Sequence, residues 1–332
     1  MTKPPARVVS GMRPTGRLHL GHLVGALHNW TALQEQYECF YFVADWHALT
    51  SEYADTAQLT RYALDNAADW IAAGVDPERS TLFIQSLVPE HAELFLLLAM
   101  SVPIPWLERV PTYKEQQENL AGKDLSTLGF LGYPLLQTAD VVLYDAQYVP
   151  VGEDQVAHLE LSREVVRRFH NFYGPVFVEP QPLLTRFPRL PGLDNRKMSK
   201  SYGNAIELSD AAETVRKKVR QMYTDPNRVR ADVPGTVEGN PVFVYHDAFN
   251  PNVAEVEDLK VRYRAGTVGD VEVKTKLAAA LNAVLEPMRA RRAALDEARL
   301  RQIVMDGSSR ARRIAGETMV RVREAMKISY RR

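Results

Sequence analysis

The sequence is poor in cysteine and has no long apolar run. Its 332 residues include one cysteine, Cys39, so an internal disulfide and a cysteine-rich metal site are both excluded. No stretch reaches the roughly 20 apolar residues of a membrane span, and no apolar signal-peptide core follows the first residues. These absences predict a cytoplasmic protein that does not enter a membrane, with Cys39 as a small buried residue.

Net charge is also missing, but charge is unevenly distributed along the chain. Lysine and arginine together number 41, as do aspartate and glutamate. Residues 1–204 hold 17 basic and 23 acidic side chains, whereas residues 205–332 hold 24 and 18. Within residues 289–332 the count is 13 basic against 5 acidic. This asymmetry favours a polyanion partner for the C-terminal part, although solvated helix faces would explain the same counts.

Short apolar runs alternate with amphipathic segments in the first part of the chain. Strands are expected at residues 7–11, 39–44, 81–84 and 148–151. Helices are expected at residues 20–36, 56–73, 134–144 and 153–171. This alternation is typical of a parallel sheet covered by helices.

Strand signals nearly vanish after about residue 205. Helical patterns there cover residues 211–223, 273–292 and 308–328, while the proline-rich residues 103–123 and 175–194 indicate connecting structure. The predicted fold class is α/β, with a Rossmann-like parallel-sheet nucleotide-binding domain followed by a smaller all-helical domain. The predicted domains are residues 1–204, with an insertion at about 103–130, and residues 205–332.

The first motif that carries chemistry is Gly16-Arg17-Leu18-His19-Leu20-Gly21-His22, which follows a strand and opens a helix. Glycine lets a flat ligand approach the backbone, and a helix N-terminus offers N–H groups and positive dipole to a phosphate. His19 and His22 can donate to phosphate oxygens. By themselves, two histidines three residues apart fit a metal pair or a helix face equally well.

The second motif is Lys197-Met198-Ser199-Lys200-Ser201, in a polar loop. Two lysines and two hydroxyls in five residues can clamp a phosphoryl group in its transition state, where negative charge builds on the phosphate oxygens. A solvated basic loop would have the same composition, so this motif alone does not decide the function.

The two motifs together resemble the paired signatures of class I aminoacyl-tRNA synthetases, with Leu20 where isoleucine is usual. Five further segments look like bacterial tryptophanyl-tRNA synthetases in order and spacing: 10–16 (SGMRPTG), 44–50 (ADWHALT), 83–86 (FIQS), 107–115 (LERVPTYKE) and 149–155 (VPVGEDQ). The resemblance covers essentially the whole chain. It implies that the helical domain binds the anticodon of tRNA.

The resemblance implies an ATP site built from both motifs and from segments between them. Its expected residues are Arg13, Pro14, Thr15, Gly21, His22, Lys114, Gly152, Glu153, Asp154, Leu190, Lys197, Met198, Ser199, Lys200 and Ser201. The catalytic roles would fall to His19, His22, Lys197 and Lys200. Arg13 stands where many relatives have glutamine.

A tryptophan pocket is implied as well, formed by Val9, Gly11, His47, Tyr133, Gln137, Asp140 and Gln155. The indole N–H is only a donor, and a buried carboxylate at Asp140 is its natural acceptor. His47 and Gln155 would face the amino and carboxylate ends of the substrate. Val9 stands where tyrosyl enzymes carry a tyrosine, and valine offers nothing polar to a phenol hydroxyl.

Other polar and aromatic residues invite simpler interpretations. Three histidines are expected in structural or surface positions: His91, His158 and His170. Three tryptophans are expected in the core or at an interface: Trp30, Trp70 and Trp106. Some relatives hold an iron–sulfur cluster on four cysteines in the second domain. This chain has no cysteine there, so no cluster and no protein-bound metal are expected.

The implied reaction joins L-tryptophan to tRNA(Trp) at the expense of ATP, with Mg²⁺ on the phosphates and a homodimer as the working unit. Three alternatives stay open. A tyrosyl-tRNA synthetase shares both signatures, and a paralogue could form an adenylate for another pathway. A regulatory RNA-binding or partner-binding protein that has lost catalysis is the third, against which the intact lysines and His22 argue.

Overall fold

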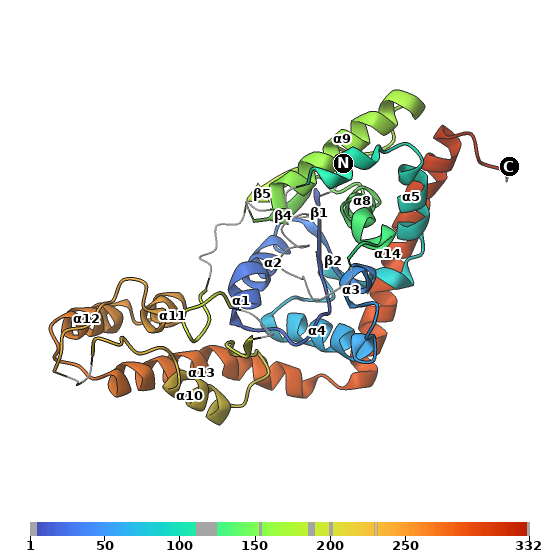
Figure 1. Ribbon diagram of the computed structural model, residues 1–332. Helices are drawn as coiled ribbons and strands as arrows, with labels where there is room; N and C mark the ends of the chain where they lie inside the picture. Colours follow the sequence, from blue (N-terminus) through green and yellow to red (C-terminus); the bar gives the residue numbers. More distant parts are fainter. Residues whose placement is uncertain are drawn as a thin grey trace.

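The computed structural model describes residues 5–110, 125–152, 155–184, 190–198, 202–228, 230 and 232–330. Its centre is a sheet of five parallel strands in the order β3-β2-β1-β4-β5 (Figure 1). The strands are β1 (Arg7–Met12), β2 (Glu38–Val43), β3 (Ser80–Ile84), β4 (Tyr148–Val151) and β5 (Gln181–Leu184). The predicted α/β fold with a parallel sheet is confirmed.

Strand β5 lies in a segment that the sequence analysis treats as connecting structure. It is an edge strand of four residues, and none of its side chains is buried. It also contains Pro182, and proline within a strand is typical of a sheet edge. The prediction missed β5 because so short and exposed a run carries little apolar signal.

Successive side chains of a strand point to opposite faces of the sheet, and here they enter two separate apolar layers. Val8, Tyr41 and Leu82 face α1 (Leu20–His22), the π-helical turn η1 (Leu23–Leu27), α2 (His28–Leu33) and α4 (Leu59–Ala73). Val9, Phe40 and Phe83 face α5 (Glu90–Ala99), α8 (Leu128–Val142) and α9 (Val156–Tyr173). The first layer also contains the buried Trp30 and Trp70, as predicted.

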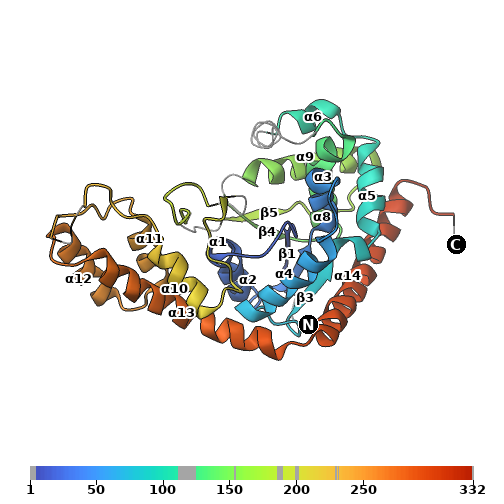
Figure 2. The same cartoon turned by 60° about the horizontal axis from the view of Figure 1, so that its bottom comes forward.

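Four helices of the C-terminal part stand away from the sheet in both views of the molecule (Figures 1 and 2). They are α10 (Ala212–Arg220), α11 (Pro241–Phe249), α12 (Val253–Arg264) and α13 (Asp270–Ala294). Helix α13 packs on α10 and α11 and also contacts α4, so it links the helical part to the sheet. Neither α11 nor α12 was predicted. The short elements α3 (Asp45–Glu52), η2 (Gln85–Leu87) and α6 (Ile104–Glu108) lie within the α/β part.

The last helix, α14 (Glu297–Ala325), returns to the sheet and packs along β3 and α5 (Figure 2). Gly307 makes this approach possible, because a Cβ atom there would lie 1.9 Å from the carbonyl oxygen of Leu82. The Ser308 hydroxyl accepts a 3.4 Å hydrogen bond from the backbone N–H of Ile84. Helix α14 therefore covers the open edge of the sheet, which would otherwise expose unpaired backbone groups.

Arginines of α14 contact the α/β part. Arg310 donates to the carbonyl oxygen of Pro77, at 3.1 Å. Three others pair with carboxylates of that part: Arg312 with Glu90, Arg321 with Asp145, and Arg323 with Glu93. Much of the basic excess after residue 289 is thus satisfied within the molecule. Among the described residues, no helix is long and apolar enough to cross a membrane.

Candidate active site

A cavity of about 390 Å³ opens at the carboxyl ends of β1 and β4. The strand order reverses between these two neighbours, and ligands of open α/β sheets bind at such a switch point. The cavity is lined by all seven residues predicted for the tryptophan pocket: Val9, Gly11, His47, Tyr133, Gln137, Asp140 and Gln155. Arg13 and Gly152, predicted for the ATP site, lie in the same lining.

Each side of this cavity comes from a different element. Val9 and Gly11 belong to β1, His47 to α3, and Tyr133 and Asp140 to α8. At Gly11 any side chain would collide with the neighbouring strand, because a Cβ atom would lie 2.4 Å from the ring of Phe42. Glycine is therefore required for β1 to end beside the cavity.

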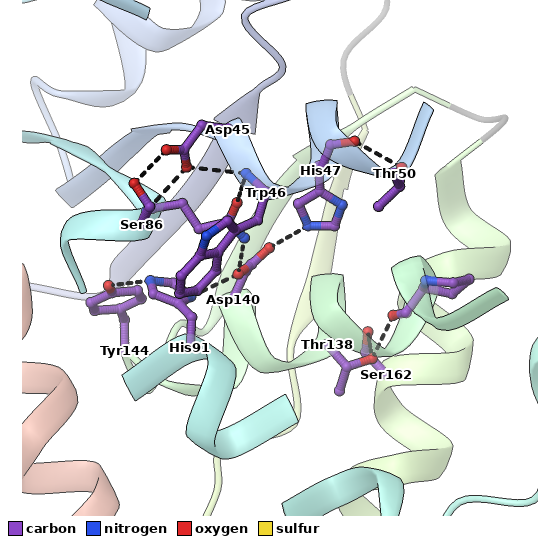
Figure 3. A network of polar contacts seen from close by, with 12 residues as sticks. Asp45, Trp46, His47, Thr50, Ser86, His91, Thr138, Asp140, Tyr144 and Ser162 are labelled. Carbon is purple, nitrogen blue, oxygen red and sulfur yellow. Dashed lines mark hydrogen bonds and ion pairs between the residues drawn. The ribbon is translucent and has the colours of Figure 1, made fainter. Parts of the chain in front are cut away.

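Asp140 lies at the centre of a buried polar network (Figure 3). Its Oδ1 atom accepts hydrogen bonds from Gln85 Nε2 and His91 Nδ1, both at 2.7 Å. Its Oδ2 atom accepts from His47 Nε2, also at 2.7 Å. The His91 ring continues the chain on its far side, where Nε2 lies 2.8 Å from the Tyr144 hydroxyl oxygen.

The network holds Asp140 in its ionised form. Burial by itself raises the pKa of this carboxyl, but the charge and hydrogen bonds of His47 and His91 outweigh burial and lower the pKa to about 2. Burial also raises the pKa of Tyr144 well above its ordinary value, so its hydroxyl keeps its proton. His91 therefore links the two groups, with its Nδ1–H donating to Asp140 and its Nε2 atom in hydrogen-bond contact with the Tyr144 hydroxyl.

Three members of this network, Gln85, His91 and Tyr144, were not predicted to have a functional connection. His91 was expected in a structural or surface position, and the structure places it fully buried against Asp140. Gln85 follows β3, and its Oε1 atom accepts from the backbone N–H of Trp46, which follows β2. Polar residues at the ends of two adjacent parallel strands were the available signal for Gln85. His158, also expected in a structural or surface position, is buried and lines the cavity.

The first motif forms a second polar cluster beside the cavity. His19 Nδ1 accepts from the backbone N–H of Gly21 at 3.2 Å, and His22 Nδ1 accepts from the backbone N–H of His19 at 3.1 Å. A neutral imidazole that accepts at Nδ1 carries its proton on Nε2, so the protonated nitrogen of both rings is Nε2. Gly21 lies close to Met198, whose Sδ would be 3.0 Å from a Cβ atom at position 21. The two motifs, far apart in the sequence, therefore meet in space.

Comparison with known proteins identifies the family. Residues 1–286 match the family described as tRNA synthetases class I (W and Y). The chain belongs to this family. Its sequence is 52% identical to a tryptophan–tRNA ligase of Treponema pallidum (strain Nichols) over 98% of each chain. The corresponding ligase of Thermotoga maritima is 49% identical over 98% of this chain and 100% of its own.

A solved structure supports the same assignment. The crystal structure of tryptophanyl-tRNA synthetase from Campylobacter jejuni, complexed with ADP and tryptophan, superposes with a TM-score of 0.88. It is 31% identical, and the match covers 97% of this chain and 99% of that one. The prediction of an aminoacyl-tRNA ligase in this family is confirmed.

The remaining residues predicted from the family's ATP site fall into two groups. The first group lies within the described residues. Pro14 and Leu190 are buried, and Thr15 and His19 line a neighbouring cavity of about 370 Å³. Lys197 pairs with Pro191 in a β-bridge. The second group lies outside the described residues: Lys114, Glu153, Asp154, Ser199, Lys200 and Ser201.

Arg13 brings a cation to the lining of the cavity of about 390 Å³. Its side chain is accessible to solvent, yet the protein around it lowers its pKa, against the opposing effects of Tyr133 and Glu52. The ordinary pKa of arginine is so high that Arg13 remains charged. A permanent positive charge therefore stands in the lining of the cavity.

Proposed function

We propose that this protein activates L-tryptophan with ATP and transfers it to tRNA(Trp) for protein synthesis. One observation carries the proposal: an ionised carboxylate, Asp140, lies in the wall of the cavity at the sheet's switch point. A buried ionised carboxylate can only accept hydrogen bonds, and the indole ring can only donate one. The motif residues His19, Gly21 and Met198 come together beside this cavity, which supports an ATP site built from both motifs.

The proposed reaction has two steps. A carboxylate oxygen of tryptophan attacks the α-phosphorus of ATP, the bond to the bridging oxygen breaks, and pyrophosphate leaves. A ribose hydroxyl of the tRNA terminus then attacks the tryptophanyl carbonyl, and AMP leaves. No protein nucleophile takes part, so the chain contributes positioning and charge stabilisation. His19 and His22 would donate from Nε2 to phosphate oxygens, and Lys197 and Lys200 would neutralise the departing pyrophosphate.

Mg²⁺ would enter bound to ATP. The residues proposed for the phosphates are histidines and lysines, whose N–H groups suit phosphate oxygens rather than a cation. In this proposal the protein works in the cytoplasm as a homodimer, as its resemblance to bacterial tryptophanyl-tRNA synthetases implies. The helices α10–α13 would contact the tRNA anticodon. The domain boundary near residue 204 belongs to the same proposal.

Tyrosine is the nearest competing substrate, and Val9 separates the two. A tyrosine hydroxyl both donates and accepts, so its pocket does best with two polar partners. Val9 is 1% exposed on β1 and lines the cavity, where it supplies no polar atom. Gln137 could serve either ring and does not decide the choice. The close relatives described above are tryptophan–tRNA ligases, which supports tryptophan.

The decisive experiment is amino-acid-dependent ATP–pyrophosphate exchange, run separately with each of the twenty amino acids. We expect exchange with tryptophan and little with tyrosine. Comparable rates with both, or a preference for tyrosine, would overturn the assignment of the substrate. Absence of exchange with every amino acid, together with binding to tRNA, would instead support a protein that has lost catalysis.

A further inference from the structure

The acceptor capacity of Asp140 is almost used up by the protein itself. An ionised carboxylate has about four lone-pair sites, two on each oxygen. Gln85 and His91 occupy both sites of Oδ1, and His47 occupies one site of Oδ2. Counting donors among the described residues, one acceptor site therefore remains, and it lies on the oxygen that bonds His47, a residue of the cavity lining.

The two donors to Oδ1 are each oriented by a second contact. Gln85 is fully buried, and its amide oxygen accepts from the Trp46 backbone N–H at 3.2 Å, which turns the amide nitrogen toward Asp140. His91 is fully buried as well, and the Tyr144 hydroxyl holds its Nε2 atom at 2.8 Å. Aromatic neighbours surround the His91 ring, with centroid distances of 6.0 Å to Phe42 and 6.1 Å to Phe83.

None of the steps proposed for catalysis uses His91, Gln85 or Tyr144. Buried polar networks are costly unless every member is satisfied, and this one is satisfied only with Asp140 as a pure acceptor. A neutral Asp140 would present a proton to a site already occupied by donors. The same network engages Gln85 and His91, which otherwise could donate to the oxygen of a phenol.

We propose that Tyr144, His91 and Gln85 form a positioning network that keeps Asp140 ionised with a single acceptor site for the substrate ring. The network thereby selects the donor-only indole of tryptophan over the phenol of tyrosine. This inference rests on the proposed function, because it assumes that tryptophan binds in the cavity. His91 is a positioning residue and does not touch the substrate.

The test compares tryptophan with an analogue whose indole N–H is replaced by sulfur, 3-benzothienylalanine, which has a similar shape and no donor. Dissociation constants for both ligands are measured by calorimetry on the full chain and on His91→Leu. We expect His91→Leu to weaken tryptophan binding roughly tenfold, the scale of one hydrogen bond to a charged group. Binding of the analogue should change by less than about twofold, since it never used the acceptor site.

Three further variants sharpen the comparison. His91→Asn retains a donor near the position of Nδ1 and should recover most of the selectivity for tryptophan over the analogue. Tyr144→Phe removes only the outer hydrogen bond and should produce a smaller loss in the same direction. His246→Leu is the matched control, because His246 is also fully buried but lies on α11. It should leave the ratio of the two dissociation constants unchanged.

Equal weakening of both ligands by His91→Leu and by Tyr144→Phe would mean that the network only supports the fold, and the proposal would be wrong. If His91→Leu does not fold, Tyr144→Phe and His91→Asn carry the same comparison. Failure of the unmodified protein to bind or activate tryptophan would overturn the proposed function instead. The two failures are therefore distinguishable.

Discussion

Buried charges in the two parts of the molecule are satisfied in different ways. Asp140, in the α/β part, accepts three side-chain donors and keeps one acceptor site at the cavity. Lys274, on α13 in the helical part, donates to Met222 O at 2.6 Å, Thr224 Oγ1 at 2.8 Å and Arg220 O at 3.4 Å. An ammonium has three donors, so Lys274 has none left. The unused acceptor site of Asp140 suits substrate recognition. Lys274, whose donors are all used, instead holds a loop in place.

The largest loss of activity should come from a substitution in the loop between these two parts. Lys197→Ala should lower the rate of adenylate formation by about 10²–10³, the scale of losing one preorganised donor, with little change in the KM for ATP. The fold should survive, because the Lys197 carbonyl that accepts from Asn204 Nδ2 is retained. Pyrophosphate exchange measures both constants. Arg196→Ala is the control, and a KM defect with kcat intact would contradict the proposed role.

Removing the carboxylate in the cavity should reduce activity less than the Lys197→Ala substitution does. Asp140→Ala should lower kcat/KM for tryptophan by roughly 10–150-fold, corresponding to about 1.5–3 kcal/mol for a charged acceptor. Asp225→Ala provides the contrast, since Asp225 is buried in the helical part and accepts from the backbone of Asn227 and Thr236. It should lower thermal stability without a comparable loss in kcat/KM. Similar kinetic defects in both variants would break the distinction between the two parts.

Removing the buried charge in the helical part should lower the stability of the fold more than the rate of adenylate formation. Lys274→Met leaves the carbonyl of Met222 and the hydroxyl of Thr224 without this donor, at an expected cost of about 1–3 kcal/mol. Burial already lowers the pKa of Lys274, with Asp270 opposing that effect. Urea unfolding should show the loss, and tRNA charging should fall while pyrophosphate exchange persists. Equal loss of charging and exchange would indicate that the helical part also supports the catalytic cavity.

How far the sequence predicts these features depends on how local they are. The seven residues predicted for a tryptophan pocket all line one cavity, because they follow strands or lie in recognisable segments. His47 was among them, but two other partners of Asp140, Gln85 and His91, were not predicted; His91 is 49 positions away on another helix and carries no motif. Arg312 belongs to the basic segment 289–332, which favoured a polyanion partner, yet it pairs with Glu90, 222 positions away. The first pairing depends on the packing of α5 against α8, and the second on the packing of α14 against β3 and α5. No pattern along the chain specifies either packing.

The smallest predicted effect is the change in the stability of each part as the pH falls. His246, on α11, donates from Nε2 to the carbonyl of Val273 at 3.0 Å and accepts at Nδ1 from Asn250 at 3.2 Å. A second proton on the ring would turn the Nδ1 acceptor into a donor and break its hydrogen bond. Burial also lowers the pKa of His246. The unfolded chain therefore takes up the proton first, so this contribution to stability falls as pH drops below about 6.5.

Asp140 loses its contribution to stability in the same direction as His246, but only at much lower pH. Its pKa is lowered to about 2, so its contribution is present above the ordinary aspartate value of about 3.9 and is lost as pH falls toward 2. Between pH 7 and 5, unfolding of the wild type and of His246→Gln should therefore converge, as the wild type loses the advantage of its neutral imidazole. Urea midpoints measured at several pH values provide the check. A constant difference between the two proteins over this range would show that His246 is not held neutral by its contacts, and that acid sensitivity does not begin in the helical part.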